Sequence, residues 1–367
     1  MRKAYIVSEE SESVYKGGIS AIIDCYFSNR LLFESLGYSL TRINPMTFKI
    51  PKNRFLSKLV NLFRIGSEQR KVLREIDKDD NNSIFHIHSG YGFVLLKSLL
   101  ICKKLKKKGK KHIILSIHFA DFEKIFSRHK LINKYEQKLA KRYVDKIILL
   151  SKHTKEEFIQ HGFLENKLDV LYTFHSYGVS NLERISKKNA NDIIQLLFVG
   201  SIDKRKGVLD LIQAVHLTTN TRLKIVFCGS SNDKEVFDKF SQEVKTLKNA
   251  SYVGYIKGEE KNKIFSQADV LALPSYGEGL PVVIMEAMHF GCGIISTNVG
   301  SISEILIENK NCFFFKPGEV NSLTSILDDL NNSKINEMKI ENVELSNRFT
   351  CENNIKQLCS IYGGFYE

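Results

Sequence analysis

The sequence lacks any apolar run long enough to cross a bilayer, which argues against a protein with membrane-spanning helices. Its 367 residues are 43% hydrophobic and 26% charged, an ordinary globular composition that is sufficient for two domains. No signal peptide is visible, because the apolar run 4–7 is only of strand length and ends at Ser8-Glu9-Glu10. We therefore expect a cytoplasmic protein, either soluble or peripheral at the inner face of the membrane.

Cysteine is scarce and forms no metal or redox motif. The seven cysteines are scattered and include no CxxC pair, which predicts reduced thiols in the core. The sequence also has no G-x-G-x-x-G after a strand, which disfavours a dinucleotide dehydrogenase. Asp79-Asp80 is the only acidic pair that resembles a metal clip, and we interpret it as part of a solvated turn.

Positive charge, by contrast, is abundant and unevenly distributed. The net charge is +13; residues 1–185 hold 34 Lys+Arg against 19 Asp+Glu, or +15, which leaves 20 against 22, or −2, for 186–367. The most basic run is 103–111, KKLKKKGKK. It is either a solvated helix end or a surface attracted to anionic lipid, at about 1 kcal/mol per basic residue. Nucleic acid is a weaker alternative, because no aromatic residues interleave with the lysines.

Apolar runs of strand length alternate with helical patterns, which predicts two doubly wound α/β domains. The polar stretch 176–192 predicts a linker, with an acceptor-side domain at 1–180 and a donor-binding domain at 190–345. The segment 346–367 has helical spacing and is expected to return to the first domain. The strand-like runs are 3–8, 38–43, 83–88, 113–118, 146–151, 169–174, 193–201, 223–229, 250–256, 269–273, 293–296 and 312–315.

Residues 269–291, DVLALPSYGEGLPVVIMEAMHFG, form a segment that packing alone does not explain. A strand-length apolar run is followed by a glycine loop and a helix pattern, and Pro281 suits the first helical position. Gly291 lies just past the last residue of the apolar run. The start of such a helix offers unpaired N–H groups and a partial positive charge, which attract an anionic group.

Two carboxylates frame this helix start. Glu278 lies in the loop, and Glu286 lies eight residues later on a helix that is apolar nearly all round. Glu286 is either a solvated helix residue or a buried carboxylate that needs polar partners. The apolar neighbours favour the second interpretation, in which both carboxylates face one polar ligand.

The segment from Pro274 to Ser296, with Gly300 and Glu304 beyond it, resembles the E-x7-E signature of glycosyltransferase family 4. These are retaining, nucleotide-sugar-dependent enzymes with the GT-B fold, two Rossmann-like domains facing a central cleft. The resemblance implies that Glu278 lies beside the donor sugar and that Glu286 binds the ribose hydroxyls. It also implies that loop amides, here at Gly279 and Leu280, hold the sugar and phosphate.

The resemblance spans about 3–360, is strongest over 196–306, and implies further site residues in the first half. Gly17-Gly18 matches the family loop beside the donor phosphates and the acceptor, although a plain turn would also explain the pair. His118 stands at the carboxyl end of a predicted strand in HFADF, which resembles the family's H-x-x-D segment. There the histidine contacts the transferred sugar. His88, at the end of its own strand, is a weaker candidate.

A basic turn in the second half resembles the family loop that grips the donor diphosphate. Lys206, before Gly207, matches the family lysine. The family arginine is missing, because Ser201 follows Gly200, and Arg205 is a candidate replacement by proximity. A surface basic turn is the alternative. The turn at 177–180 departs from the family pattern, and we assign it no ligand contact.

The sequence as a whole predicts transfer of a sugar from a nucleoside diphosphate, UDP- or GDP-linked, to a hydroxyl of a glycan or polyprenyl-linked acceptor. The resemblance implies a role in cell-surface polysaccharide biosynthesis. Cationic side chains would stabilise the leaving diphosphate, so no metal or other cofactor is expected. The alternatives are a nucleotide-sugar epimerase of the same fold and, less favoured, a basic nucleic-acid-binding protein.

Overall fold

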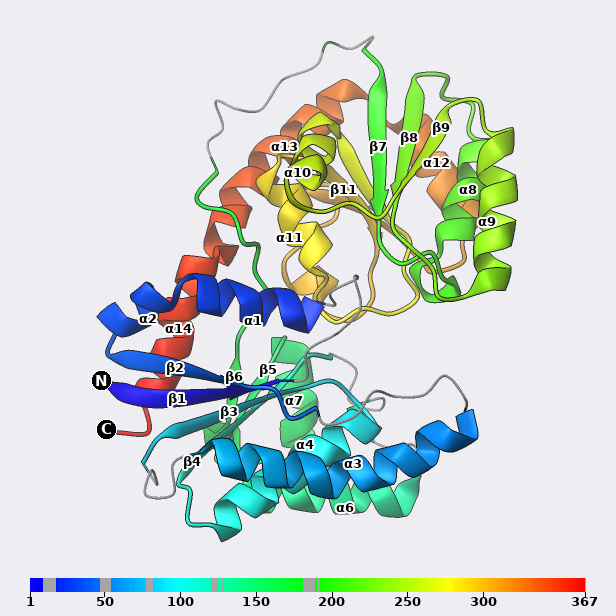
Figure 1. Cartoon of the computed structure of the whole chain (residues 1–367). Helices are drawn as coiled ribbons and strands as arrows, with labels where there is room; N and C mark the ends of the chain where they lie inside the picture. Colours follow the sequence, from blue (N-terminus) through cyan, green and yellow to red (C-terminus); the bar gives the residue numbers. More distant parts are fainter. Residues whose placement is uncertain are drawn as a thin grey trace. The chain divides into compact units, whose positions relative to one another are not determined.

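The chain forms two compact units, each built on its own parallel sheet and its own core (Figure 1). One unit consists of Met1–Tyr172 with Cys351–Glu367, and the other of Thr173–Thr350. The computed structural model describes residues 1–8, 18–46, 54–76, 82–119, 125–126, 129–180, 189 and 192–366. Within these ranges, every helix is too short or too polar to cross a bilayer.

The sheet of the first unit has six parallel strands in the order β2-β1-β3-β4-β5-β6. Strand β3 is buried along its whole length, as expected for a parallel sheet covered on both faces. The strands are β1 (Arg2–Val7), β2 (Tyr38–Ile43), β3 (Ile84–Ser89), β4 (His112–Ile117), β5 (Lys146–Leu149) and β6 (Leu168–Val170).

Successive side chains of β3 point to opposite faces, so the two faces of this sheet differ. Phe85 and Ile87 join an apolar core with side chains of α3, α4, α6 and α7. His86 and His88 point to the other face, where α1 and α14 pack. The helices of the unit are α1 (Gly18–Ser28), α2 (Arg30–Ser35), α3 (Arg54–Glu75), α4 (Phe93–Lys107), α6 (Lys130–Tyr143), α7 (Lys152–Gln160) and α14 (Cys351–Gly363).

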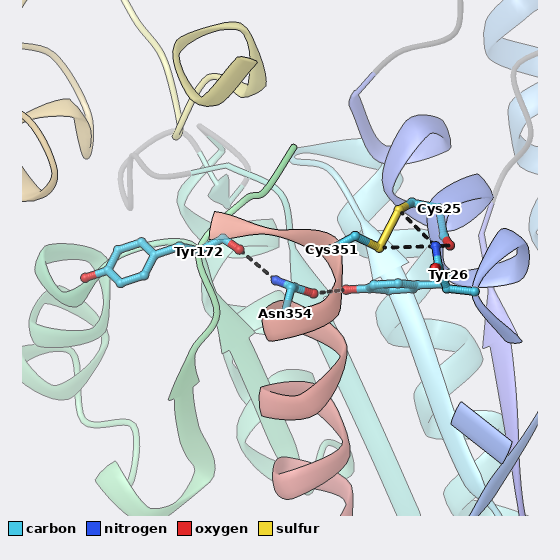
Figure 2. Close-up of a disulfide and its surroundings, with 6 residues drawn as sticks. Cys25, Tyr26, Tyr172, Cys351 and Asn354 are labelled. Atoms are coloured by element: carbon cyan, nitrogen blue, oxygen red, sulfur yellow. Dashed lines mark hydrogen bonds between the residues drawn. A yellow bond between two sulfur atoms is a disulfide. The ribbon is translucent and has the colours of Figure 1, made fainter. Parts of the chain in front are cut away.

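Helix α14 returns to the first unit and is joined to it by polar side chains and a disulfide (Figure 2). Asn354 accepts a hydrogen bond from the Tyr26 hydroxyl at 2.8 Å and donates one to the Tyr172 carbonyl at 2.9 Å. Cys25 of α1 is bonded to Cys351 of α14. The expectation that all seven cysteines are free thiols is therefore wrong for this pair, while the other five are free and buried. The sequence could not predict the pair, because 326 residues separate the two cysteines.

The sheet of the second unit also has six parallel strands, in the order β12-β11-β10-β7-β8-β9. This is the Rossmann order, which reverses between β7 and β10. The strands are β7 (Ile194–Val199), β8 (Leu223–Cys228), β9 (Ala250–Gly254), β10 (Val270–Leu273), β11 (Gly293–Thr297) and β12 (Cys312–Phe315).

Helices cover both faces of this second sheet (Figure 1). Helices α8, α9 and α12 pack on one face, where Phe198 and Phe227 lie in the core with Phe240 of α9. Helices α10, α11 and α13 cover the other face. The helices are α8 (Val208–Leu217), α9 (Lys234–Thr246), α10 (Gly258–Gln267), α11 (Val282–His289), α12 (Val320–Asp329) and α13 (Asn332–Ser346).

Candidate functional site

The candidate donor site lies in the loops that follow β7 and β10. These strands pair at the point where the strand order reverses, with β8 and β9 on one side and β11 and β12 on the other. In open parallel sheets, ligands bind outside the carboxyl ends of the strands at such a point. Three predicted donor residues, Arg205, Lys206 and Glu278, lie in these two loops.

Lys206 and Glu278 form an ion pair at the centre of this site. The Lys206 Nζ lies 2.5 Å from Glu278 Oε1, and the two side chains are only 12% and 8% exposed. Arg205 approaches the other carboxylate oxygen, with Nη1 at 3.6 Å, and donates to the Gly277 carbonyl at 2.9 Å. The structure therefore brings three of the predicted site residues together, as two cations around one carboxylate.

The basic turn that carries Arg205 and Lys206 is shaped by Asp203. Its carboxylate accepts hydrogen bonds from the Lys206 amide at 2.9 Å and from the Ser201 hydroxyl at 2.5 Å. Ser201, which stands where the family has an arginine, therefore stabilises the turn through Asp203. The replacement of that arginine by Arg205 stays a prediction.

Two glycines allow the loops around Glu278 to touch through their backbones. Gly207 has φ +64°, and a Cβ atom there would lie 2.0 Å from the Pro274 carbonyl oxygen. Gly300 has φ +61°, and its Cβ would lie 2.1 Å from the Glu278 carbonyl oxygen. Only glycine fits both positions, so the loops after β7, β10 and β11 form one connected backbone frame.

Helix α11 begins one residue later than expected. Pro281 has φ −72° and ψ 124°, which is extended backbone, so it precedes the helix and the prediction that it is the first helical residue is wrong. The helix ends at His289, and Gly291 follows with φ +72°. The N–H groups of the first turn of α11 therefore follow directly on the loop that carries Glu278.

Gly279 and Leu280 connect Glu278 to this helix start. The carbonyl of Gly279 accepts from the Ser301 amide at 3.1 Å, and that of Leu280 accepts from the Thr173 hydroxyl at 2.9 Å. Both carbonyls are therefore engaged within the protein, and the resemblance assigns the N–H groups of Gly279 and Leu280 to the ligand. Their role in holding the sugar and phosphate stays a prediction.

Glu286 is buried on α11 and pairs with a cation that sequence reasoning missed. Its carboxylate accepts from Lys261 Nζ of α10 at 2.6 Å, and its side chain is 10% exposed. The alternative of a solvated carboxylate is therefore excluded. Burial raises the pKa of Glu286, and the attraction of Lys261 opposes that rise. No signal in the sequence pairs residues 261 and 286, since the contact depends on how α10 packs beside α11.

Tyr177 is a second residue beside Glu286 that the sequence analysis set aside. Its hydroxyl donates to the Asn262 side chain at 2.9 Å, and its ring stacks on His289 with centroids 4.7 Å apart. Burial raises the pKa of Tyr177, and the charge of Glu286 adds to this effect. An aromatic face, an amide and a carboxylate with its lysine thus gather at one place, which suits recognition of a nucleoside.

In the first unit, His118 follows β4 and lies beside His88 at the end of β3. The His118 Nε2 and His88 Nδ1 atoms are 2.8 Å apart, and the two rings are nearly parallel. Burial lowers the pKa of His118 to about 4, so its imidazole is neutral at pH 7. His88, the weaker sequence candidate, is therefore the direct neighbour of the stronger one.

The structure describes only part of the other sequence motifs predicted in the first unit. Gly18 is the first residue of α1, and Gly17 lies outside the described residues, as does Asp79-Asp80. Within the described ranges, no group of three or more His, Cys, Asp or Glu side chains is arranged to hold a metal ion.

Comparisons with known proteins give one family match and several similar chains. Residues 180–346 match the family model of glycosyl transferases group 1. A Klebsiella pneumoniae relative, described as an uncharacterized 41.2 kDa protein in cps region, is 26% identical over 318 residues, or 85% of each chain.

Two solved structures share the fold. The lipopolysaccharide outer core galactosyltransferase WaaB superposes with a TM-score of 0.72, at 18% identity, over 98% of both chains. HepE of Anabaena, in complex with UDP-glucose, gives a TM-score of 0.71 at 15% identity, over 99% of this chain and 100% of that one. We conclude that the chain has the GT-B fold and that its residues 180–346 are similar to the glycosyl transferases of group 1.

Proposed function

We propose that this protein is a retaining glycosyltransferase that moves a sugar from a nucleoside diphosphate to a hydroxyl group of a glycan or lipid-linked acceptor. The observation that carries the proposal is the cluster of Lys206, Arg205 and Glu278 at the reversal point of the second sheet. HepE binds UDP-glucose on the same fold, which supports a nucleotide-sugar donor. The names of WaaB and of the Klebsiella relative support a role in cell-surface polysaccharide biosynthesis.

In this proposal the cluster changes partners when the donor binds. The ion pair between Lys206 and Glu278 holds both charged groups in place before binding. A diphosphate would attract Lys206 and Arg205, which frees the Glu278 carboxylate to accept hydrogen bonds from sugar hydroxyls. The same cations and the N–H groups at the start of α11 stabilise the diphosphate as it leaves.

The acceptor oxygen forms a bond to the anomeric carbon, and the bond from that carbon to the diphosphate oxygen breaks with its electron pair staying on that oxygen. The proton of the acceptor hydroxyl passes to the departing diphosphate. The chain's own cations stabilise the leaving group in this proposal, so transfer should persist after treatment with EDTA. Loss of transfer in EDTA, restored by a divalent ion, would contradict this part of the proposal.

The decisive experiment is a thermal-shift panel of UDP, GDP, ADP and CDP and their sugars, followed by transfer assays with the donor that stabilises the protein. Bound ligand should raise the melting temperature, because it binds only the folded state. Nuclear magnetic resonance of the product then reports the anomeric configuration, which should be retained. Conversion of the donor without any acceptor would support an epimerase instead, and stabilisation by no nucleoside diphosphate would overturn the proposal.

We further propose that the first unit attaches to an anionic membrane surface through α4 and α6. On α6, the exposed apolar residues Leu131, Ile132 and Tyr135 lie among the exposed lysines 130, 134 and 138. Lys103 of α4 donates to the Tyr135 hydroxyl, so the two helices adjoin there. Apolar side chains interspersed with lysines suit the boundary between lipid headgroups and acyl chains.

The lysine run 103–111 contributes only part of its charge to this surface. Lys104, Lys107, Lys108 and Lys111 are exposed. Lys106 instead pairs with Asp145 at 2.6 Å, and Lys110 is buried over the ring of Phe85. The solvated-turn interpretation is therefore incomplete, and a membrane test should change the four exposed lysines and leave the other two intact.

A further inference from the structure

The histidine pair at the carboxyl ends of β3 and β4 is built so that one ring constrains the other. The strands pair in register, with His88 opposite Ser116, and the amide of His118 donates to the Ser89 carbonyl at 2.9 Å. The backbone therefore brings the rings of His88 and His118 to the same edge of the sheet. Their facing nitrogens, His88 Nδ1 and His118 Nε2, are 2.8 Å apart.

Two neutral imidazoles at this distance must hold complementary protons. Burial lowers the pKa of both residues, so each ring carries one N–H and one acceptor nitrogen at neutral pH. Either His88 Nδ1–H donates to His118 Nε2, or His118 Nε2–H donates to His88 Nδ1. The proton on the far nitrogen of each ring follows from that choice.

The surroundings of His88 favour the first arrangement. His88 is 6% exposed, and its Nε2 is buried without a hydrogen-bond partner in the described part of the chain. The second arrangement would place an unpaired N–H donor there, which proteins avoid more strictly than an unpaired acceptor. In the first arrangement that nitrogen carries no hydrogen, and His118 carries its proton on Nδ1. His118 is only partly buried, so water or a ligand can accept from this Nδ1–H.

The ring of His88 is held in place by its neighbours on the α14 face of the sheet. It packs against the His86 ring with centroids 4.1 Å apart and lies near the Tyr26 ring at 6.3 Å. His86 is itself hydrogen-bonded on both nitrogens, to Tyr362 of α14 and to Ser116, each at 2.7 Å. His88 therefore cannot turn away from His118 without disturbing a buried polar network.

We propose that His88 is a positioning residue that fixes His118 as the Nδ1–H tautomer and so makes it a hydrogen-bond donor toward substrate. A free histidine side chain prefers its proton on Nε2, so the pairing with His88 imposes the less common form. An Nδ1–H donor can bind a sugar hydroxyl oxygen, and it cannot accept the proton of an attacking hydroxyl. This inference rests on the proposed function only where it names a sugar as the partner of His118.

The direct test is nuclear magnetic resonance of the protein labelled with 15N at its ten histidines, without any substrate. His118 is assigned by the signal that disappears in His118→Gln. We expect the wild-type His118 signal to report a protonated Nδ1 and an unprotonated Nε2. A protonated Nε2 in the wild-type protein overturns the proposal.

Variants of His88 test whether this residue sets the tautomer of His118. His88→Leu removes the donor, so His118 should revert to the Nε2–H form. His88→Asn places an amide N–H near the former Nδ1 position and should keep the Nδ1–H form. The matched control is His153→Leu, which removes an exposed histidine of α7 in the same unit and should leave the tautomer of His118 unchanged. Persistence of the Nδ1–H form in His88→Leu would overturn the assignment to His88.

Kinetics separate this inference from the proposed function. For a wild-type enzyme that transfers sugar, His88→Leu should lower kcat/KM about tenfold, the effect of one hydrogen bond, with nucleotide affinity unchanged. His88→Asn should recover most of the loss. Absence of transfer by the wild type, with the expected tautomer present, defeats the proposed function alone. Normal transfer with His118 protonated on Nε2 defeats this inference alone.

Discussion

A Cβ atom on Gly300 would lie 2.1 Å from the carbonyl oxygen of Glu278, much closer than non-bonded atoms approach. The neighbour is backbone and cannot swing aside. Gly300→Ala should therefore displace the loop that carries Glu278 and weaken nucleotide-sugar binding by about tenfold or more, equivalent to at least about 1.4 kcal/mol. Isothermal titration calorimetry with the donor identified by the panel measures this loss.

The control for this variant is Gly37→Ala in the first unit. Gly37 also has a positive φ, +92°, but no atom lies within 4 Å of its Cβ position. Its alanine variant carries the strain of a left-handed residue, about 1–2 kcal/mol, without a clash near the site. Its donor affinity should equal that of the wild type. Equal affinities for Gly300→Ala and the wild type would contradict the role of the close contact.

Lys206 should bind the diphosphate rather than the nucleoside or sugar. Lys206→Ala should therefore weaken binding of the nucleoside diphosphate far more than binding of the bare nucleoside, because charge-assisted hydrogen bonds contribute about 1.5–3 kcal/mol. Calorimetry with both ligands gives the two losses. Lys204→Ala, an exposed lysine of the same turn, is the matched control and should bind both ligands as the wild type does. Similar losses for the two ligands in Lys206→Ala would refute the assignment.

Nucleotide affinity should fall at acidic pH through protonation of Glu286. Ribose hydroxyls donate to the ionised carboxylate, so affinity is present above the raised pKa of Glu286 and is lost as pH falls through it. Lys261→Met removes the attraction that opposes this rise, and the loss should then begin at higher pH. A nucleotide sugar is the best ligand for the titration, because its diphosphate does not change charge near neutral pH.

Glu286→Gln is the control for this titration. It should weaken binding by about 1–3 kcal/mol at neutral pH and flatten the pH dependence, since the titrating group is gone. Burial raises the pKa of Tyr177, so this residue stays neutral in the acidic range and adds no slope there. An unchanged affinity in Glu286→Gln, with the fold intact, would end the proposed role for this residue.

Attachment to anionic vesicles should depend on salt and on the exposed lysines in the last turn of α4 and just after it. The protein should sediment with phosphatidylglycerol-containing vesicles at 0.1 M salt and be released at 1 M, because the Debye length falls from ~10 Å to ~3 Å. Replacement of Lys104, Lys107, Lys108 and Lys111 by Gln should remove most of the binding. The matched control replaces four exposed lysines of the second unit, Lys224, Lys245, Lys248 and Lys263. Equal binding of the two variants, or none by the wild type, would contradict the proposal.

Alternation of apolar runs was enough to predict the doubly wound parallel sheets. The bounds of β2 and β12 coincide with the predicted runs 38–43 and 312–315. The run 169–174 was predicted as a strand, but β6 pairs only over Leu168–Val170. Its neighbour β5 ends at Leu149, and an apolar pattern contains no information on where a partner strand stops.

Some residues of the candidate site could be identified from the sequence, and others only from the structure. Glu278 and the basic turn stand next to glycines and strand ends, and Glu286 stands on an apolar helix, while the resemblance to family 4 implied their roles. Lys261 was missed and Tyr177 was set aside, because their contacts with α11 exist only in the folded chain. His88 was ranked below His118 from its sequence context, although the two rings are hydrogen-bonded to each other.

The return of α14 to the first unit has a consequence for the order of folding during synthesis. Tyr362 and Asn354 complete hydrogen bonds to His86 and Tyr26, so the first sheet lacks part of its cover until the last residues have been made. The second unit, Thr173–Thr350, is continuous in sequence and is translated in full before α14 emerges from the ribosome. The half of the protein that is synthesised first is therefore the half that is completed last.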